Sequence, residues 1–199
     1  MDDRKAVKLG DLDRLHGLVN GATQRRSAPV ESWDPPYCGD IGLKIGRDGI
    51  WYYRGSPFTR PALVKLFASV LRRDADGRTF LVTPTEKVDV EVEDAPFLAV
   101  EMEARGTGRS QSISFRTNVD DVVTCGAEHP MRIDLQQPGG GLKPYVLVRG
   151  RLEALLTRAL LHDLVALAVE ELLQGAPVPG VWSEGTFFPF VADAALSAP

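Results

Sequence analysis

The first part of the chain alternates between helical and strand-like hydrophobic spacing. Leu9, Leu12, Leu15 and Leu18 recur at helical spacing, which predicts a helix over residues 9–20. Two apolar runs, 41–45 and 50–53, flank Asp48-Gly49, and this pair is typical of a tight hairpin turn. A helix is then expected from Thr59, its predicted N-cap, through about residue 71, followed by a strand over 79–83. The pattern therefore predicts a small unit of mixed helix and strand.

From Lys87 onward the pattern changes to short runs in which apolar and polar residues alternate. Seven strands are expected, over residues 88–92, 97–103, 112–117, 122–124, 131–135, 145–148 and 152–156. One long apolar helix is then predicted over 157–174. This order of elements is that of a pleckstrin-homology-like β-barrel closed by a C-terminal helix, an analogy of shape that carries no function. We therefore predict an α+β protein with domains 1–84 and 85–191 and a tail, 192–199.

A short phrase occurs twice, once in each predicted domain. Arg54-Gly55 is followed by Thr59-Arg60 and an apolar helix, and Arg149-Gly150 is followed by Thr157-Arg158 and another apolar helix. Each copy comes after a run of aromatic and β-branched residues. The repeated phrase suggests two related halves with a duplicated strand-helix core, and duplicated halves favour a ligand site at their interface.

Composition narrows the class of protein. With 44% hydrophobic and 25% charged residues among 199, the chain can bury globular cores. The formal net charge of −4 argues against a nucleic-acid polymer as partner, and no apolar run approaches the length of a membrane span. The N-terminus has no apolar signal core, and the two cysteines, Cys38 and Cys125, are expected to be free thiols. We expect a cytoplasmic protein.

Candidate catalytic chemistry is sparse. The three histidines have no partner at a metal-ligand spacing, so no metal or cofactor is predicted. Each cysteine is expected to be a small buried residue rather than a nucleophile. The glycine-rich stretches at 106–108 and 138–141 join strand to strand, whereas a phosphate loop must lead into a helix. The remaining enzymatic hypothesis is a hydrolase using Asp40 or Glu86.

The arginines at the two predicted helix starts are the strongest candidate site. Arg60 and Arg158 lie where the helix dipole disfavours a cation, so each position asks for an explanation. A functional interpretation is an anion clamp made of a guanidinium and helix N–H groups. A structural interpretation is an ion pair with Asp40, Glu86 or Glu153.

Several short motifs occur in an order that resembles the bacterial domain of unknown function 1285 family, over roughly residues 35–170. These are Cys38-Gly-Asp-Ile41, Asp48-Gly-Ile-Trp51, Gly55-Ser-Pro57, Arg60-Pro-Ala-Leu-Val64, Leu66-Phe-Ala-Ser-Val-Leu71, Leu81-Val-Thr-Pro84, Glu86-Lys87, Val92-Glu-Asp-Ala-Pro-Phe97, Thr117-Asn118, Tyr145-Val146, Val148-Arg-Gly150, Leu152-Glu-Ala-Leu155 and Arg158. The resemblance implies a duplicated α+β core, a second half similar to pleckstrin-homology domains and a ligand site between the halves. It also implies a nucleotide-like ligand and a signalling role as proposals, with no enzymatic activity established.

Together these observations predict a non-catalytic ligand-binding or sensor protein with a role in signal transduction. An anionic small molecule, with a nucleotide as one candidate, would bind at the interface of the two domains. The residues expected to hold its anionic group are Arg60, Arg149 and Arg158. Those expected to stack on it or orient it are Trp51, Tyr145, Asn118 and Glu86.

A second hypothesis is a protein-interaction module that binds a protein partner through the barrel edge or the aromatic segment 180–190. The alternative for this segment is that it docks on the protein's own core.

Overall fold

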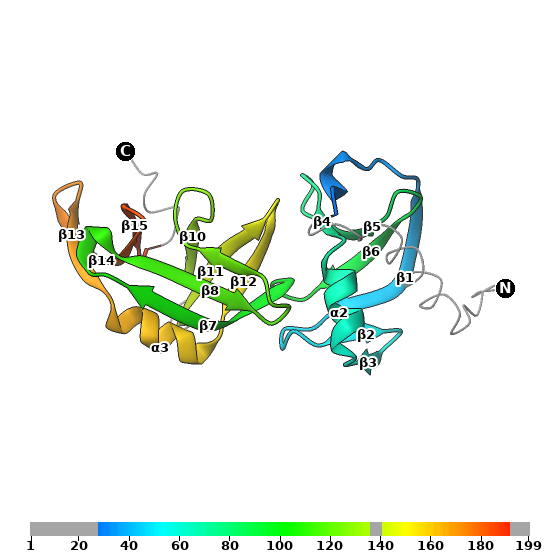
Figure 1. The fold of residues 1–199 in the computed structure, drawn as a ribbon, viewed down its shortest axis with the longest axis horizontal. Helices are drawn as coiled ribbons and strands as arrows, with labels where there is room; N and C mark the ends of the chain where they lie inside the picture. The colour runs from blue at the N-terminus through cyan, green and yellow to red at the C-terminus, as the bar shows by residue number, and fades with distance from the viewer. Residues whose placement is uncertain (1–27, 136–140, 192–199) are drawn as a thin grey trace. The chain divides into compact units, whose positions relative to one another are not determined.

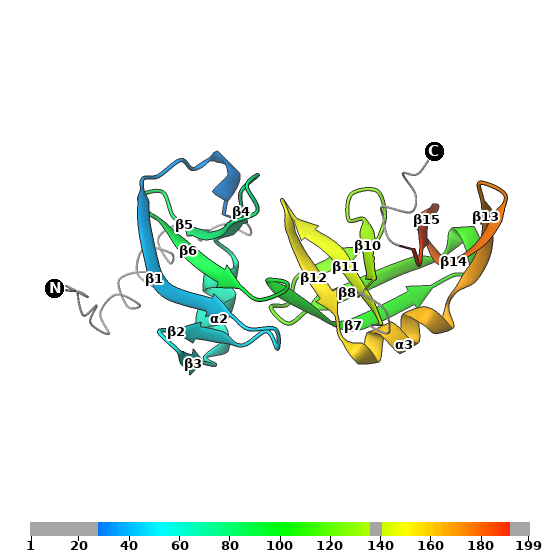
Figure 2. The ribbon, with the colours of Figure 1, turned by 180° about the vertical axis from the view of Figure 1, so that it is seen from behind.

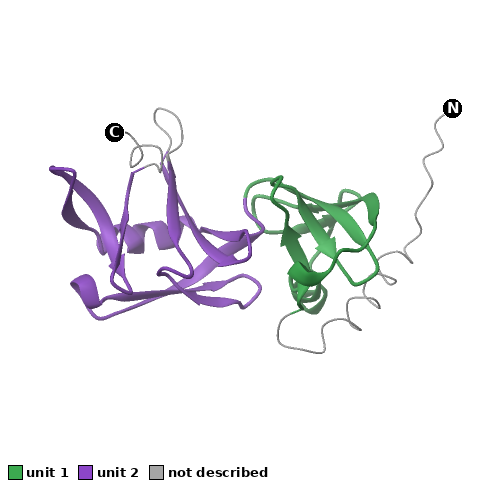
Figure 3. Cartoon of the chain, turned by 90° about the horizontal axis from the view of Figure 1, so that it is seen from above, with its two compact units in different colours: residues 1–94 green, residues 95–199 purple. Residues whose placement is uncertain are grey.

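The computed structural model describes residues 28–135 and 141–191. The chain divides into two compact units, residues 1–94 and 95–199, which Figure 3 colours green and purple. Strands predominate in both units, and the described residues include two α-helices. The helix expected over residues 9–20 and the tail from 192 lie outside the described residues.

The first unit is built on a six-stranded sheet with the strand order β3-β2-β1-β6-β5-β4. Its elements are η1 (Val30–Ser32), β1 (Tyr37–Ile45), β2 (Trp51–Tyr53), β3 (Ser56–Phe58), α2 (Pro61–Ala68), β4 (Leu71–Arg73), β5 (Thr79–Val82) and β6 (Lys87–Val92). Adjacent strands pair antiparallel except β1 and β6, which run parallel. Figures 1 and 2, which show the ribbon from the front and from behind, place α2 against one face of this sheet.

Local sequence accounts for much of this unit. Gly49 takes a positive φ of 77° in the turn, and Ile45 then pairs with Trp51, which confirms the predicted hairpin. The helix ends near Ala68 because Val70 and Leu71, which are fully buried, continue into β4. The core lies between α2 and the sheet, and its large members are Trp51, Phe67, Leu43, Ile45, Leu71 and Leu81.

The boundary between the units lies about ten residues later than the predicted one at 84/85. β6 pairs with β1 on one side and β5 on the other, so it is a central strand of the first sheet. The first unit therefore extends to Asp94. The alternation over 88–92 identified a strand correctly, but alternation contains no information about which strands it joins.

The second unit contains a six-stranded sheet with the order β10-β11-β12-β7-β8-β9 and a three-stranded sheet with the order β13-β14-β15. Its strands are β7 (Phe97–Arg105), β8 (Ser112–Thr117), β9 (Val122–Thr124), β10 (Met131–Leu135), β11 (Leu142–Arg149), β12 (Leu152–Leu156), β13 (Val169–Leu173), β14 (Ala176–Ser183) and β15 (Thr186–Pro189). Its helical elements are η2 (Gly108–Ser110) and α3 (Arg158–Ala166).

The larger sheet of the second unit is open, a half-barrel whose end strands are β10 and β9. Among the described residues these two strands do not pair, so the closed pleckstrin-homology-like barrel is not formed. Closure requires every strand to have two neighbours. Strand lengths and turns, from which the barrel was predicted, do not determine whether the last pair forms.

The long C-terminal helix predicted over 157–174 is also wrong in its second half. α3 ends at Ala166, and residues 169–173 form β13, which pairs with β14 from Val169–Gly180 to Leu173–Ala176. Gln174 and Gly175 both have positive φ, 53° and 84°, and this turn reverses the chain. Helical spacing of leucines was therefore outweighed by pairing with a strand further along the chain.

The aromatic segment 180–190 packs on its own unit, as one of the two interpretations predicted. Val181, Phe188 and Phe190 are buried. Ser183 is fully buried, accepts a hydrogen bond from Ile113 N (2.9 Å) and donates one to Cys125 O (2.6 Å). This segment is therefore a structural part of the second unit.

Neither described helix is long and apolar enough to cross a membrane.

The repeated phrase has the same order of elements in both units. Arg54-Gly55 turns β2 into β3 before α2, and Gly150 turns β11 into β12 before α3. The buried helix positions differ, however. Phe67 is fully buried, whereas Val165, which follows Arg158 at the same distance in sequence as Phe67 follows Arg60, is 45% exposed. The phrase therefore repeats a turn and a helix start, while each helix buries a different face.

Candidate functional site

The helix starts bring together a cation and uncapped backbone groups in each unit. Arg60 is the N-cap of α2, in place of the expected Thr59, and Arg158 is the first residue of α3. Neither helix has a side-chain capping bond or an acidic residue in its first turn. Pro61 contributes no N–H, so α3 offers more free N–H groups than α2 does.

Both guanidinium groups are exposed and lack an ion pair with any described residue. The structural interpretation required an acidic partner. Glu153 instead binds Arg132, at 2.7 and 2.8 Å, and Asp40 accepts a hydrogen bond from Gly42 N at 2.7 Å. Within residues 28–135 and 141–191, neither Arg60 nor Arg158 has the acidic partner that the structural interpretation required.

Arg149, predicted to bind the same anion, already has an anionic partner. Its Nη1 atom donates to Asp121 Oδ2, and its guanidinium lies 5.0 Å from the centre of the buried Phe97 ring. The side chain is half-buried. Arg149 thus joins β11 to the loop after β8, which is a structural role.

The two aromatic residues predicted to stack are core residues. Trp51 is 1% exposed and packs against Phe58 and Phe67, with ring centroids 6.0 and 6.2 Å away. Tyr145 is 4% exposed and is covered by the Arg132 guanidinium at 4.0 Å. Both rings are therefore core residues of their units, and their burial gives the stacking prediction no support.

The two predicted orienting residues are also engaged in backbone structure. Asn118 accepts a hydrogen bond from Leu98 N (3.0 Å) and its own N–H donates to Leu98 O (2.8 Å), so it extends the pairing of β7 with β8. Glu86 lies in the turn between β5 and β6, where its N–H donates to Thr83 Oγ1 at 3.1 Å. Asn118 and the backbone of Glu86 thus take part in strand pairing and turn formation, and their orienting role stays a prediction.

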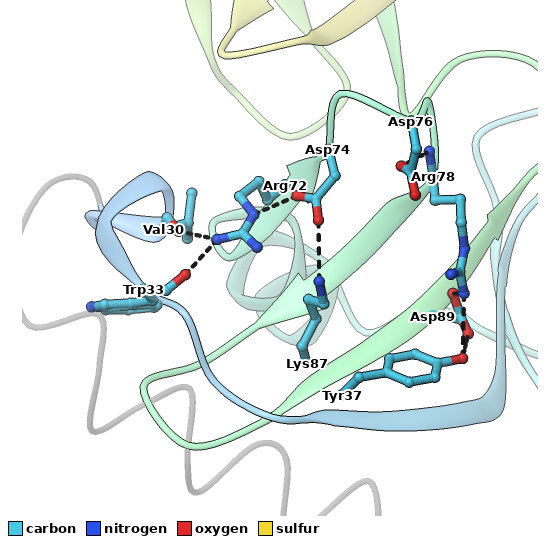
Figure 4. Close-up of polar contacts among 9 residues, drawn as sticks. All are labelled: Val30, Trp33, Tyr37, Arg72, Asp74, Asp76, Arg78, Lys87 and Asp89. Atoms are coloured by element: carbon cyan, nitrogen blue, oxygen red, sulfur yellow. Dashed lines mark hydrogen bonds and ion pairs between the residues drawn. The ribbon is translucent and has the colours of Figure 1, made fainter.

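The first unit carries a charged network that the sequence pattern did not predict. Arg72 is buried and donates to Val30 O (2.8 Å), Trp33 O (2.6 Å) and Asp74 Oδ1 (2.7 Å), while Lys87 donates to Asp74 Oδ2 (3.1 Å) (Figure 4). Burial alone would raise the pKa of Asp74, but the hydrogen bonds from Arg72 and Lys87 lower it below its usual value. The network fastens the segment around η1 to β4.

A second group lies beside it and shares strand β6 with it. Asp89 accepts hydrogen bonds from Tyr37 and from Arg78 (2.5 Å to Oδ1), as Figure 4 shows. Arg78 and Lys87 also lie over the Phe80 ring, at 4.9 and 4.4 Å. Arg78 and Lys87 are neutralised by Asp89 and Asp74, so an external anion would have to displace these carboxylates.

One sequence signal could have indicated this network. Lys87 and Asp89 alternate with Val88 and Val90, so charges occupy one face of a strand that is central in its sheet. Charged side chains on a central strand require partners on the neighbouring strands. Those partners were not identifiable without the strand order.

The described residues contain no cluster of three or more histidine, cysteine or carboxylate side chains able to hold a metal ion. The predicted free thiols are confirmed, since Cys38 and Cys125 are not joined. Cys125 is fully buried as expected, but Cys38 is exposed, contrary to the prediction. Burial raises the pKa of the Cys125 thiol to about 12.

The two thiols should therefore differ in reactivity. With a thiol-reactive disulfide reagent near neutral pH, we expect one fast equivalent from Cys38. Cys125 should react slower by a factor on the order of a hundred or more, because it needs a local opening of the fold. Cys38→Ser should remove the fast phase only. Equal rates for both thiols in the folded protein would contradict this assignment.

Comparison with known protein families identifies the family to which the chain belongs. The model described as "Domain of unknown function (DUF1285), N-terminal domain" matches residues 28–95, and that described as "Protein of unknown function (DUF1285), C-terminal domain" matches residues 96–190. The chain belongs to the DUF1285 family. These two matches abut within a residue of the boundary between the two units.

Two solved structures of DUF1285 family proteins resemble the chain. The protein from Silicibacter pomeroyi DSS-3 is 42% identical, with a TM-score of 0.80, and the match covers 92% of this chain and 98% of that one. The protein from Shewanella baltica OS155 is 30% identical, with a TM-score of 0.49, and the match covers 63% and 91%. None of the curated proteins matches the chain.

Proposed function

We propose that this DUF1285 family protein is a non-catalytic binding protein for a small anionic molecule, with Arg60 in the first unit and Arg158 in the second, each taken by itself, as candidate contacts for an anionic group. One observation carries the proposal. Each guanidinium is exposed at a helix start, without an ion pair to any described residue, beside N–H groups that no side chain caps.

Two features of each helix start would attract an anion, the backbone of the helix end and the guanidinium. The N-terminal end of a helix attracts negative charge through its dipole and its free N–H groups. A guanidinium adds a full positive charge and a planar pair of donors that match phosphate or carboxylate oxygens. A cation at this position weakens the helix slightly when no anion is bound, so an anion would relieve that cost.

A nucleotide remains one candidate ligand, supported by the match between phosphate groups and these two cationic helix starts. The aromatic partners first predicted for a base are buried, so recognition in this proposal depends on the anionic group. A role in signal transduction would follow if binding changed the stability or partners of the protein.

The test is a thermal-shift screen of nucleotides, pyrophosphate and phosphorylated sugars. A ligand that binds only the folded protein adds about 2.7 kcal/mol of stability at a hundredfold excess over its Kd. We expect at least one anion to raise the unfolding midpoint, and Arg60→Ala or Arg158→Ala to reduce that shift.

Arg151→Ala is the matched control, since Arg151 is an exposed arginine in the β11–β12 turn and not at a helix start. It should retain the full shift. The absence of a shift with every anion, or equal loss of the shift in all three variants, would count against the proposal.

A further inference from the structure

In the three-stranded sheet, β14 pairs with β13 on one side and with β15 on the other, whereas β13 has a single described strand partner. Pro177 and Pro179 lie on β14, opposite Leu172 and Glu170 of β13. A proline cannot donate to a strand partner, so in an antiparallel pair it occupies a position that makes no hydrogen bond to its opposite residue. Phe190 N donates to Pro179 O (2.7 Å), which shows that the backbone of Pro179 faces away from β13.

This register determines where the polar groups of β13 point. Because the pairs Glu170–Pro179 and Leu172–Pro177 lack mutual hydrogen bonds, the N–H and C=O groups of Glu170 and Leu172 point away from β14. β13 is an end strand of its sheet among the described residues, as Figures 1 and 2 show. Two donors and two acceptors are therefore presented along an open edge.

β13 is short and carries two acidic residues, Glu170 and Glu171, but it lacks the stronger protection that many edge strands have. Such strands are commonly blocked by proline, lysine or a bulge, and β13 has none of these. The other side of β14, by contrast, is paired with β15 and accepts a hydrogen bond from Phe190 N at Pro179 O. Leu172 is 75% exposed, which is the largest exposure among the large apolar side chains described.

The side chains beside this edge define the chemistry of a partner. Glu170 and Leu172 are two residues apart, so they lie on the same face of the strand. Glu170 has no ion pair with a described residue, whereas Glu171, on the other face, accepts a hydrogen bond from Trp182 Nε1 at 2.9 Å. An unpaired acid and an exposed leucine would match a basic and an apolar side chain two residues apart.

We propose that β13 binds an extended segment of a partner protein as an additional strand, with a basic side chain beside Glu170 and an apolar side chain beside Leu172. Backbone hydrogen bonds from Glu170 and Leu172 would hold the segment, and charge complementarity would select it. This surface is independent of the arginines at the helix starts.

The test uses the full chain and a labelled synthetic peptide of about eight residues, a typical strand length. Threonine occupies every second position of this peptide, and lysine and valine alternate at the remaining positions. We expect saturable binding by fluorescence anisotropy and slower hydrogen exchange at the amides of Glu170 and Leu172. The same peptide with methylated backbone nitrogens should bind at least about tenfold more weakly, because it cannot pair as a strand.

Charge swaps provide the matched controls. Glu170→Lys should weaken binding of the lysine peptide by about tenfold and favour a peptide with glutamate in place of lysine. Glu128→Lys changes the same charge at another exposed site of this unit and should stay within about twofold of the parent. Leu172→Pro, which removes one outward donor, should also weaken binding.

Three results would overturn the proposal. The first is equal binding of the methylated and unmethylated peptides, and the second is equal loss in Glu170→Lys and Glu128→Lys. The third is a dimer in solution whose Glu170 and Leu172 amides are protected without peptide, since a second copy would then occupy the edge. Because the Glu170 substitution is on the surface, it tests the proposal even if Leu172→Pro fails to fold.

Discussion

Replacing Trp51 with alanine is expected to lower the free energy of unfolding of the first unit by about 3–5 kcal/mol. Trp51 is 1% exposed, and its ring packs against Phe58 and Phe67 between α2 and the sheet. Removing the indole leaves a cavity, because rings held by a strand and a helix can close only part of the space. Urea unfolding followed by circular dichroism would measure the change.

Tyr52→Ala is the matched control for this prediction. Tyr52 is the next residue of β2, lies on the opposite face and is only half-buried, so its loss should cost about 1 kcal/mol. A Trp51→Ala protein that kept its stability but lost an anion-induced thermal shift would indicate that Trp51 contacts the ligand. The two measurements together therefore separate a core residue from a ligand contact.

Gly180→Ala is expected to destabilise the second unit by about 3 kcal/mol. Gly180 is buried at the centre of the three-stranded sheet, between Val169 and Pro189. A Cβ atom there would lie 2.5 Å from Phe187 Cζ, 2.5 Å from Phe188 O and 2.8 Å from Pro189 Cα. Two of these atoms belong to the backbone, so the clash cannot be relieved by rotating a side chain.

The control for this prediction is Gly141→Ala. Apart from its chain neighbours, no atom of the described residues lies within 4 Å of a Cβ built at Gly141, and its φ lies outside the left-handed region. The free energy of unfolding of this variant should therefore stay within about 0.5 kcal/mol of the parent's. Equal midpoints for the two alanine variants would show that the aromatic hairpin can separate from the rest of the unit. A selective loss in Gly180→Ala would confirm that the segment belongs to the core.

Elements that depend on neighbouring residues were predicted well. β8, β9, β10 and β12 have the predicted bounds, and the hairpin around Asp48-Gly49 forms as expected. Each of these is specified by alternation of side chains along a strand or by the φ that a turn glycine allows. Such preferences act over a few residues and need no distant partner.

Elements that depend on distant partners were predicted less well. β6 joined the first sheet through β1 and β5, and β13 replaced the end of a predicted helix by pairing with β14. In both cases the local pattern was compatible with more than one arrangement. Hydrogen bonding to another strand then decided between them.

The candidate site shows the same division. The sequence indicated unusual cations at two helix starts, and the structure leaves Arg60 and Arg158 exposed. It could not indicate that Arg149 would meet Asp121 or that Trp51 and Tyr145 would be buried. Residue type suggests what a side chain can bind, but exposure depends on the elements packed around it.

The sequence alone therefore determined the family, most strand positions and the repeated turn-to-helix phrase, because these depend on short-range pattern and order. Tertiary structure decided which strands share a sheet, which arginines have partners and which edge of a hairpin stays open. Those properties arise from contacts between residues far apart in the chain, and local preference does not specify such contacts.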